Sequence, residues 1–168
     1  YNEKRRLKLD VNKVDKDHHD HFLNGAIFEV YDKTADAYVT TLASGQLMIT
    51  GEEKDEEYEI SKKEDFSKII KTVKTDENKQ VVLDIDDGTY YSRKVGDDKV
   101  TKHVVKDGKA VLADAIYGHE YEFKEIKAPT SYQLADKSKA YKVEADEETD
   151  TIIYYFENAR IVVPNTGV

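Results

Sequence analysis

LKLDVNK, at residues 7–13, alternates between apolar and polar side chains up to its last position. In a β-strand every second side chain lies on the same face, so the three apolar residues share a face with Lys13. The alternation returns in five further segments, at 25–31, 38–42, 121–125, 141–145 and 151–159. Short strands separated by charged turns predict an all-β sandwich rather than a sheet of alternating strands and helices.

The composition of the 168-residue chain excludes several classes of function. Its formal net charge of −9 makes nucleic acid an unfavourable partner, because phosphate contacts depend on Lys and Arg. Since the chain has no cysteine, it can form no disulfide, thiolate metal site or cysteine nucleophile. No apolar run is long enough to cross a bilayer. We find no phosphate-binding loop, nucleophile elbow or dinucleotide fingerprint, so no cofactor is expected.

The middle of the chain, at about 44–103, has a different pattern. Residues 61–64, SKKE, have the spacing of a helix capping box. Apolar residues then recur at helical spacing, namely Phe66, Ile69, Ile70 and Val73. This predicts one short helix. Two apolar segments farther on, 80–85 and 89–95, flank Asp86-Asp87-Gly88 and predict a β-hairpin.

Three polar residues continue apolar faces of predicted strands. They are Lys13, Glu125 (after Tyr121 and Phe123) and Asn158 (after Ile152, Tyr154 and Phe156). Burying each alone would cost several kcal/mol, so we expect them to be buried together. Without water, desolvation disfavours the charged forms of an amine and a carboxyl.

A neutral Lys13 amine is a nucleophile, and folding would supply its proximity to the amide of Asn158. A protonated Glu125 could hydrogen-bond the Asn158 carbonyl and pass protons to the departing ammonia. The product would be an intramolecular Lys13–Asn158 isopeptide bond. The alternation leaves alternatives open: Glu157 could point inward in place of Asn158, Lys13 could reach water, and Glu125 could pair with a neighbouring lysine.

Three separated motifs resemble the collagen-adhesin B-type (CnaB) domains of Gram-positive pilins and surface adhesins. Residues 12–15 (NKVD) and 23–30 (LNGAIFEV) resemble the family's opening. Residues 121–129 (YEFKEIKAP) match its E-box, and 156–159 (FENA) stand where it places the acceptor. The resemblance implies an Ig-like or prealbumin-like β-sandwich. It also implies that, in forming the isopeptide bond, Lys13 supplies the amine, Asn158 is the acceptor and Glu125 is the catalytic carboxyl.

The chain departs from the family pattern at two places. Residues 128–132 (APTSY) lack the glycine of the family's A-P-x-G-Y, which is replaced by Ser131. Residues 44–103 have no counterpart in a minimal domain of this family. We therefore expect an N-terminal linker at 1–6, a sandwich at 7–160 with an α+β excursion at about 44–103, and a separate C-terminal segment at 161–168.

The C-terminal segment resembles the L-P-x-T-G signal that sortases cleave. It consists of Val163, Pro164, Asn165, Thr166 and Gly167. The resemblance implies sortase as a partner and an extracellular location, either covalently anchored to cell-wall peptidoglycan or within a pilus of other pilin subunits. The expected role is a structural or adhesive domain that is not an enzyme beyond its single self-directed reaction.

Two other functions are compatible with the sequence. The excursion at 44–103 could recognise a host extracellular protein or another pilin, with the sandwich as a stalk. A hydrolytic or metal-dependent enzyme would instead need an open pocket that holds Glu125 or the histidine cluster His18, His19 and His21. These histidines are plausible zinc or nickel ligands, but adjacent side chains in a turn rarely converge on one ion, which favours a solvated loop.

Overall fold

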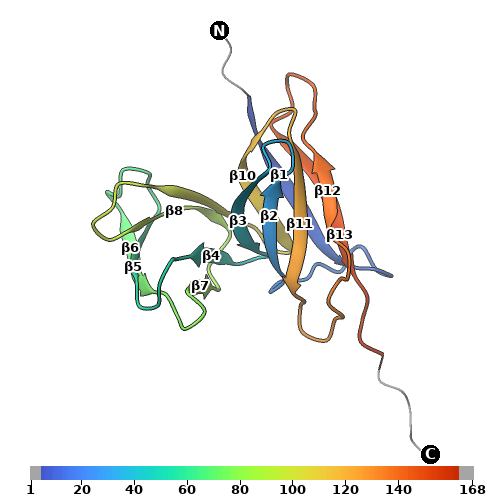
Figure 1. Ribbon diagram of the computed structural model, residues 1–168, viewed down its shortest axis with the longest axis horizontal. Helices are drawn as coiled ribbons and strands as arrows, with labels where there is room; N and C mark the ends of the chain where they lie inside the picture. The colour runs from blue at the N-terminus through green and yellow to red at the C-terminus, as the bar shows by residue number, and fades with distance from the viewer. Residues whose placement is uncertain (1–4, 163–168) are drawn as a thin grey trace, which may run out of the picture.

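The alternating segments fold into β-strands in the computed structural model, which describes residues 5–162. Within that range there are thirteen strands and no helix (Figure 1). The strands are β1 (Arg6–Asp15), β2 (Ile27–Asp32), β3 (Ala37–Ala43), β4 (Leu47–Thr50), β5 (Glu57–Ser61), β6 (Ile69–Lys74), β7 (Gln80–Leu83), β8 (Gly88–Lys94), β9 (Thr101–Val105), β10 (Lys109–Ile116), β11 (Glu120–Lys127), β12 (Lys139–Lys142) and β13 (Thr151–Asn158). The strands predicted at 7–13 and in the five further segments are thereby confirmed.

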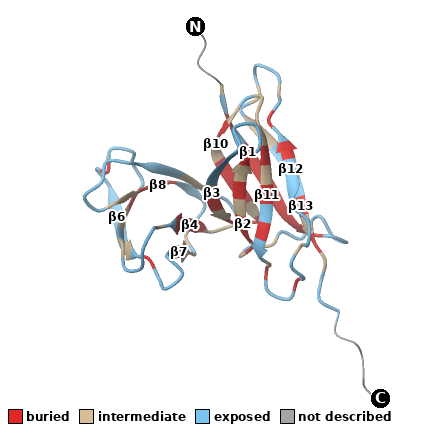
Figure 2. Cartoon of the chain, in the orientation of Figure 1, coloured by how far each residue is buried: buried red, intermediate tan, exposed pale blue. Residues whose placement is uncertain are grey.

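Two facing sheets form a β-sandwich. One has the order β10-β1-β13, with β1 antiparallel to β10 and parallel to β13. The other has the order β12-β11-β2-β3 and is antiparallel throughout. Buried residues, red in Figure 2, lie on strands of both sheets. Their side chains form one apolar cluster, in which Phe28 packs edge-to-face on Phe123 and Phe156. The first and last strands are therefore neighbours.

The six strands between β3 and β10 form two further sheets beside the sandwich (Figure 1). They are β4-β7 and β6-β5-β8-β9, and we call them together the β4–β9 region. This region has an apolar cluster of its own, which consists of Leu47, Ile49, Ile60, Val81, Tyr90 and Val105.

The predicted helix in this region is wrong, because the residues from Ser61 onward form a turn followed by a strand. The Ser61 hydroxyl accepts a bond from the Lys63 amide and lies 3.0 Å from the carbonyl oxygen of Lys68, which closes the turn. Phe66 adopts a left-handed φ of 57°, which a helix cannot contain. Residues 69–74 then pair with β5, since β-branched side chains fit a sheet better than a helix.

The predicted hairpin around Asp86-Asp87-Gly88 is also wrong. Strand β7 pairs with β4, whereas β8 pairs with β5 and β9. The aspartates are held by other groups: the Asp86 carbonyl accepts the Tyr90 hydroxyl, and an Asp87 carboxylate oxygen accepts the Asp107 amide. The segment therefore carries the chain from one small sheet to the next instead of turning it back.

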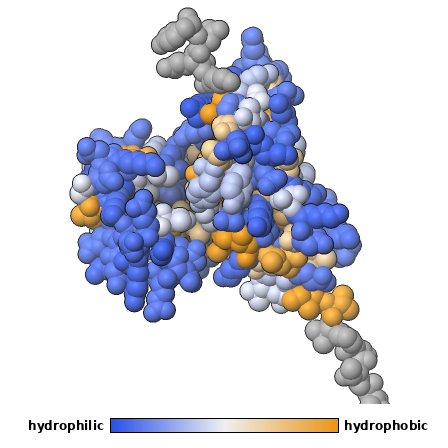
Figure 3. All heavy atoms as spheres, in the orientation of Figure 1, coloured by the Kyte–Doolittle hydropathy of each residue, from blue (hydrophilic) through white to orange (hydrophobic). Residues whose placement is uncertain are grey.

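The outer surface of the molecule is largely hydrophilic on the face drawn in Figure 3. Apolar residues on this face gather at the end of the sandwich from which the C-terminal segment leaves. Ile161 and Val162 are among the exposed apolar residues. Within residues 5–162 no helix has the length and apolar character to span a membrane.

Candidate functional site: a buried amine, amide and carboxyl

Lys13 lies in the core of the sandwich, as its position on the apolar face of β1 predicts, and its side chain is fully buried. It stands beside Phe156 in the parallel pairing of β1 with β13. Its Nζ donates to the Phe156 carbonyl at 3.0 Å and lies 5.5 Å from the centre of the Phe156 ring. Because the amine is inside, the alternative in which Lys13 reaches water is wrong.

Asn158 follows Phe156 by two residues and therefore shares its face of β13. Its amide is buried, with 2% of the residue exposed, whereas Glu157 points outward and pairs with His19. The alternative with Glu157 inward is thus wrong. Because β1 and β13 are parallel neighbours, the Lys13 and Asn158 side chains lie on the same inner face, near the end of both strands.

Glu125 reaches this place from the opposite sheet, where β11 pairs with β2, and 4% of it is exposed. Its Oε1 accepts the Asn158 Nδ2–H at 2.6 Å and the Ala135 amide at 2.9 Å. We expected Glu125 to bond the Asn158 carbonyl instead. The amide nitrogen faces Glu125 because the Gln133 carbonyl, 2.7 Å away on the other side, also needs a donor.

The electrostatics of the site favour a reactive amine. Burial lowers the pKa of Lys13 to about 8, although the negative charges of Glu125 and Glu157 act in the opposite direction. Two buried oxygens, Glu125 Oε2 and Asn158 Oδ1, have no hydrogen-bond partner. Unpartnered buried oxygens cost free energy, so these two atoms destabilise the core as it stands. The fold therefore places an amine (Lys13), an amide (Asn158) and a carboxyl that can carry a proton (Glu125) in the same part of the core.

The end of β1 is fixed by a second polar contact. The Asp15 carboxylate accepts the Tyr132 hydroxyl at 2.6 Å and the Arg160 guanidinium at 3.1 Å. The Tyr132 hydrogen bond is the largest cause that holds the pKa of Asp15 well below its usual range. Ser131, which replaces the family's glycine, adopts a left-handed φ of 72°. Glycine adopts this backbone conformation at a lower cost than a residue with a Cβ.

The histidine cluster His18, His19 and His21 does not converge on one point. His19 stacks on Tyr155 with ring centres 5.4 Å apart, and His18 and His21 meet edge to face at 6.0 Å. No group of three or more potential ligands within the described residues is arranged to hold a metal ion. The sorting-signal residues Val163–Gly167 lie outside the described residues.

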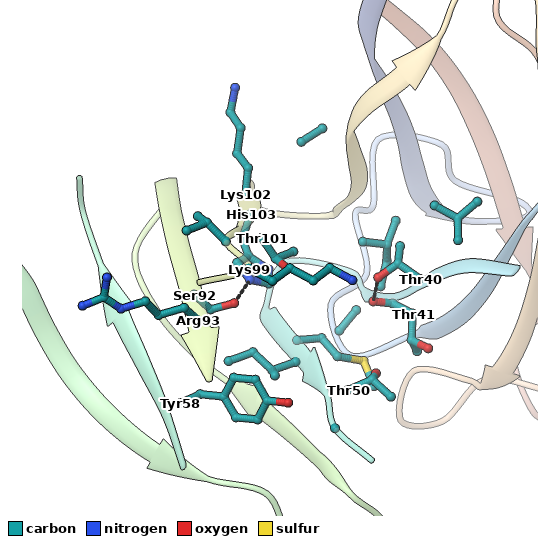
Figure 4. A pocket seen from close by; sticks show the side chains of 18 of the residues that line it. Thr40, Thr41, Thr50, Tyr58, Ser92, Arg93, Lys99, Thr101, Lys102 and His103 are labelled. Atoms are coloured by element: carbon teal, nitrogen blue, oxygen red, sulfur yellow. Dashed lines mark hydrogen bonds between the residues drawn. The ribbon is translucent and has the colours of Figure 1, made fainter. Parts of the chain in front are cut away.

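A cleft of about 710 Å³ lies between the sandwich and the β4–β9 region (Figure 4). Many of its lining residues carry hydroxyl groups, and Ser92 Oγ lies 2.7 Å from His103 Nε2. Burial lowers the pKa of His103 to about 4, so the ring is neutral near pH 7. Sequence reasoning missed this cleft because its walls come from strands that are distant in the chain. It holds neither Glu125 nor the histidine cluster.

Comparison with known proteins gives a family for the chain. No curated protein matches it. Similar solved structures include GBS52, the minor pilin of Streptococcus agalactiae, at 18% identity and a TM-score of 0.46, covering 98% of this chain and 49% of that one. They also include the full-length major pilin SpaD of Corynebacterium diphtheriae, at 16% identity and a TM-score of 0.45, covering 95% and 32%. The chain thus spans half or less of these proteins.

The strongest comparison is with a family model. The model for the SpaA prealbumin-like fold domain matches residues 68–160, which include β10 to β13 together with Glu125 and Asn158. This agrees with the expected prealbumin-like sandwich. Because the match extends over more than half of the chain, the chain belongs to the family of SpaA prealbumin-like fold domains.

Proposed function

We propose that the chain is a structural domain of a Gram-positive pilin or surface protein, held together by an isopeptide bond between Lys13 and Asn158. Family membership supports the class of protein. The observation that carries the bond is the 2.6 Å contact from the Asn158 amide nitrogen to Glu125, beside a fully buried lysine. The reaction is a single self-directed turnover and not catalysis on a substrate.

The reaction balances with the groups in the site. The neutral Lys13 nitrogen attacks Cγ of Asn158, the new C–N bond forms, and the bond from Cγ to Nδ2 breaks. Glu125, already in contact with Nδ2, carries a proton from the attacking amine to the leaving nitrogen, which departs as ammonia. A hollow of about 430 Å³ lined by residues 133–137 and 156–159 lies beside Asn158 and offers the ammonia a way out.

The bond would join the first strand of the sandwich to the last. Tension applied at the two ends of the chain would then pass through the bond and not through the strands between them. Closing a loop of about 145 residues should also stabilise the fold by about 5 kcal/mol on the chain-entropy model. Such an amide is indifferent to redox conditions, which fits a chain without cysteine.

Intact mass under denaturing conditions tests the bond. We expect a Lys13–Asn158 linked peptide, with one ammonia lost at this site, and Glu125→Ala should restore that ammonia. Glu122→Gln, on the other face of the same strand, is the matched control and should leave the linked peptide in place. Loss of the bond should lower the melting temperature by about 10–20 °C. A wild-type digest without the linked peptide refutes the proposal.

The division into a linker at 1–6, a sandwich at 7–160 with an insertion at about 44–103, and a sorting segment at 161–168 belongs to the same proposal. Sortase would cleave between Thr166 and Gly167 and join the chain to cell-wall peptidoglycan or to another pilin subunit. Purified sortase with an amine acceptor should give a product that ends at Thr166, and Thr166→Ala should give none. Equal amounts of this product from the wild-type chain and from Thr166→Ala would contradict the proposed sorting segment.

The cleft beside the sandwich favours a second candidate function, namely binding of a host extracellular protein or another pilin. Its position between two parts of the fold, with hydroxyl groups on its walls, is typical of a recognition site. Thr101→Trp, at an exposed lining residue, should abolish binding to immobilised pilin subunits or host matrix proteins while the Lys13–Asn158 linked peptide persists. Unchanged binding would exclude the cleft.

A further inference from the structure

A second amine, amide and carboxyl meet on the outer face of the same sheet. Lys109 of β10 stands directly opposite Asn12 of β1. Its Nζ donates to Asn12 Oδ1 and lies 3.8 Å from Asp10 Oδ1. Asn12 Cγ, the carbon that an amine would attack, is one bond from the oxygen that the lysine already contacts.

This cluster is buried although it faces away from the sandwich core. Asp10 and Asn12 are each 4% exposed, and the Lys109 side chain is 14% exposed. The central position of β1 explains this, since neighbouring strands flank both short side chains with larger ones, such as Tyr155 beside Asn12. The ring of Phe22, centred 5.6 Å from Lys109 Nζ, lies over the amine.

This cluster and the one around Lys13 share a feature, namely buried oxygens without a hydrogen-bond partner. Among residues 5–162, three buried side-chain oxygens have no hydrogen-bond partner, and they belong to Asp10, Glu125 and Asn158. All three therefore fall in the two clusters that combine a lysine, an asparagine and a carboxyl. Burial raises the pKa of Asp10, which makes this carboxyl a ready proton acceptor.

We propose that Lys109 and Asn12 form a second intramolecular isopeptide bond, with Asp10 as the proton carrier. Asp10 takes a proton from the Lys109 ammonium, and the neutral nitrogen attacks Asn12 Cγ. The Nζ–Cγ bond forms and the Cγ–Nδ2 bond breaks. Of the three ammonium protons, one stays on the new amide, one reaches the leaving nitrogen to give ammonia, and one is released through Asp10.

The position of this bond has a mechanical consequence. Asn12 precedes β2, and Lys109 begins the strand that follows the β4–β9 region. The bond would therefore close a loop that contains β2, β3 and the whole β4–β9 region. Force carried along β1 would not unfold that region, which would stay attached to the sandwich as a closed unit.

Intact mass and peptide mapping under denaturing conditions test the proposal, because ion pairs do not survive there and amide bonds do. We expect the wild-type chain to lose two molecules of ammonia, with Lys109 and Asn12 in one linked peptide. Lys109→Arg, which keeps the positive charge beside Asp10, should restore one ammonia. Asp10→Asn should do the same, and Lys106→Arg, at a nearby lysine, should change nothing.

The two proposed bonds can be tested independently of each other. Lys13→Arg should leave the Lys109–Asn12 peptide linked, and Lys109→Arg should leave the Lys13–Asn158 peptide linked, which also shows that the variant has folded. A wild-type digest in which Lys109 and Asn12 lie in unlinked peptides overturns this inference, whatever the state of Lys13. A digest that contains only the Lys109–Asn12 linkage overturns the proposed Lys13–Asn158 bond instead.

Discussion

Without its acceptor, Lys13 would remain as a free amine in the core, and its pKa would then govern how stability depends on pH. Asn158→Ala creates this situation, since it removes the amide and leaves the lysine and Glu125 in place. Burial lowers the pKa of Lys13 from 10.5 to about 8 in the folded chain. One pKa unit corresponds to about 1.4 kcal/mol, so the shift corresponds to a penalty of about 3 kcal/mol.

The direction in which stability changes with pH follows from which state, folded or unfolded, binds the Lys13 proton more tightly. The unfolded chain holds the Lys13 proton up to pH 10.5, whereas the folded chain releases it at about 8. The penalty on folding is therefore complete below about pH 8 and disappears as the pH rises through 10.5. Stability should increase over this interval. In the wild-type chain the proposed bond to Asn158 would consume the Lys13 amine, so this contribution should be absent.

Urea denaturation of Asn158→Ala and of the double variant Lys13→Met/Asn158→Ala measures the effect. The two chains share every other titrating group, so the difference between their unfolding free energies isolates Lys13. That difference should change by about 3 kcal/mol between neutral pH and about pH 10.5, in favour of the chain that keeps Lys13. A difference that stays constant over this range would refute the account of a desolvated amine.

Three other substitutions test the packing and the turns around the site. Phe28→Ala should lower the unfolding free energy by about 3–5 kcal/mol in urea denaturation, because Phe28 is fully buried between two aromatic rings; a loss below about 1 kcal/mol would contradict this. Ser131→Gly should stabilise the fold by about 1 kcal/mol in thermal unfolding, since its φ of 72° suits glycine, and a lower melting temperature would argue against strain at the turn. Tyr132→Phe should raise the pKa of Asp15 toward 3.8 in an NMR titration, because the Tyr132 hydroxyl is its main stabilising partner. The contribution of Asp15 to stability, present above pH 3.8 and lost as the pH falls, should shrink in that variant, and an unmoved pKa would exclude the contact.

Alternation in the sequence was sufficient to predict the sandwich strands, and it made the burial of three polar side chains an expectation with alternatives still open. A period of two fixes which residues share a face, so Lys13, Glu125 and Asn158 could be placed inside from the apolar neighbours that precede them. The same reasoning failed between residues 61 and 95. There, apolar residues at helical spacing form a strand, because pairing with β5 and the turn at Ser61 outweigh local spacing.

What the sequence determined by itself is which residues share a face of each strand, and thereby which polar groups were candidates for burial together. Only the tertiary structure decided which groups meet, because strand order and register are set by contacts between distant segments. The parallel pairing of β1 with β13 places Asn158 on the same inner face as Lys13, and the pairing of β1 with β10 sets Lys109 opposite Asn12. The second cluster could not be predicted from the sequence, because Asp10 and Asn12 occupy the polar face of their strand. No local sequence pattern shows that neighbouring strands cover that face.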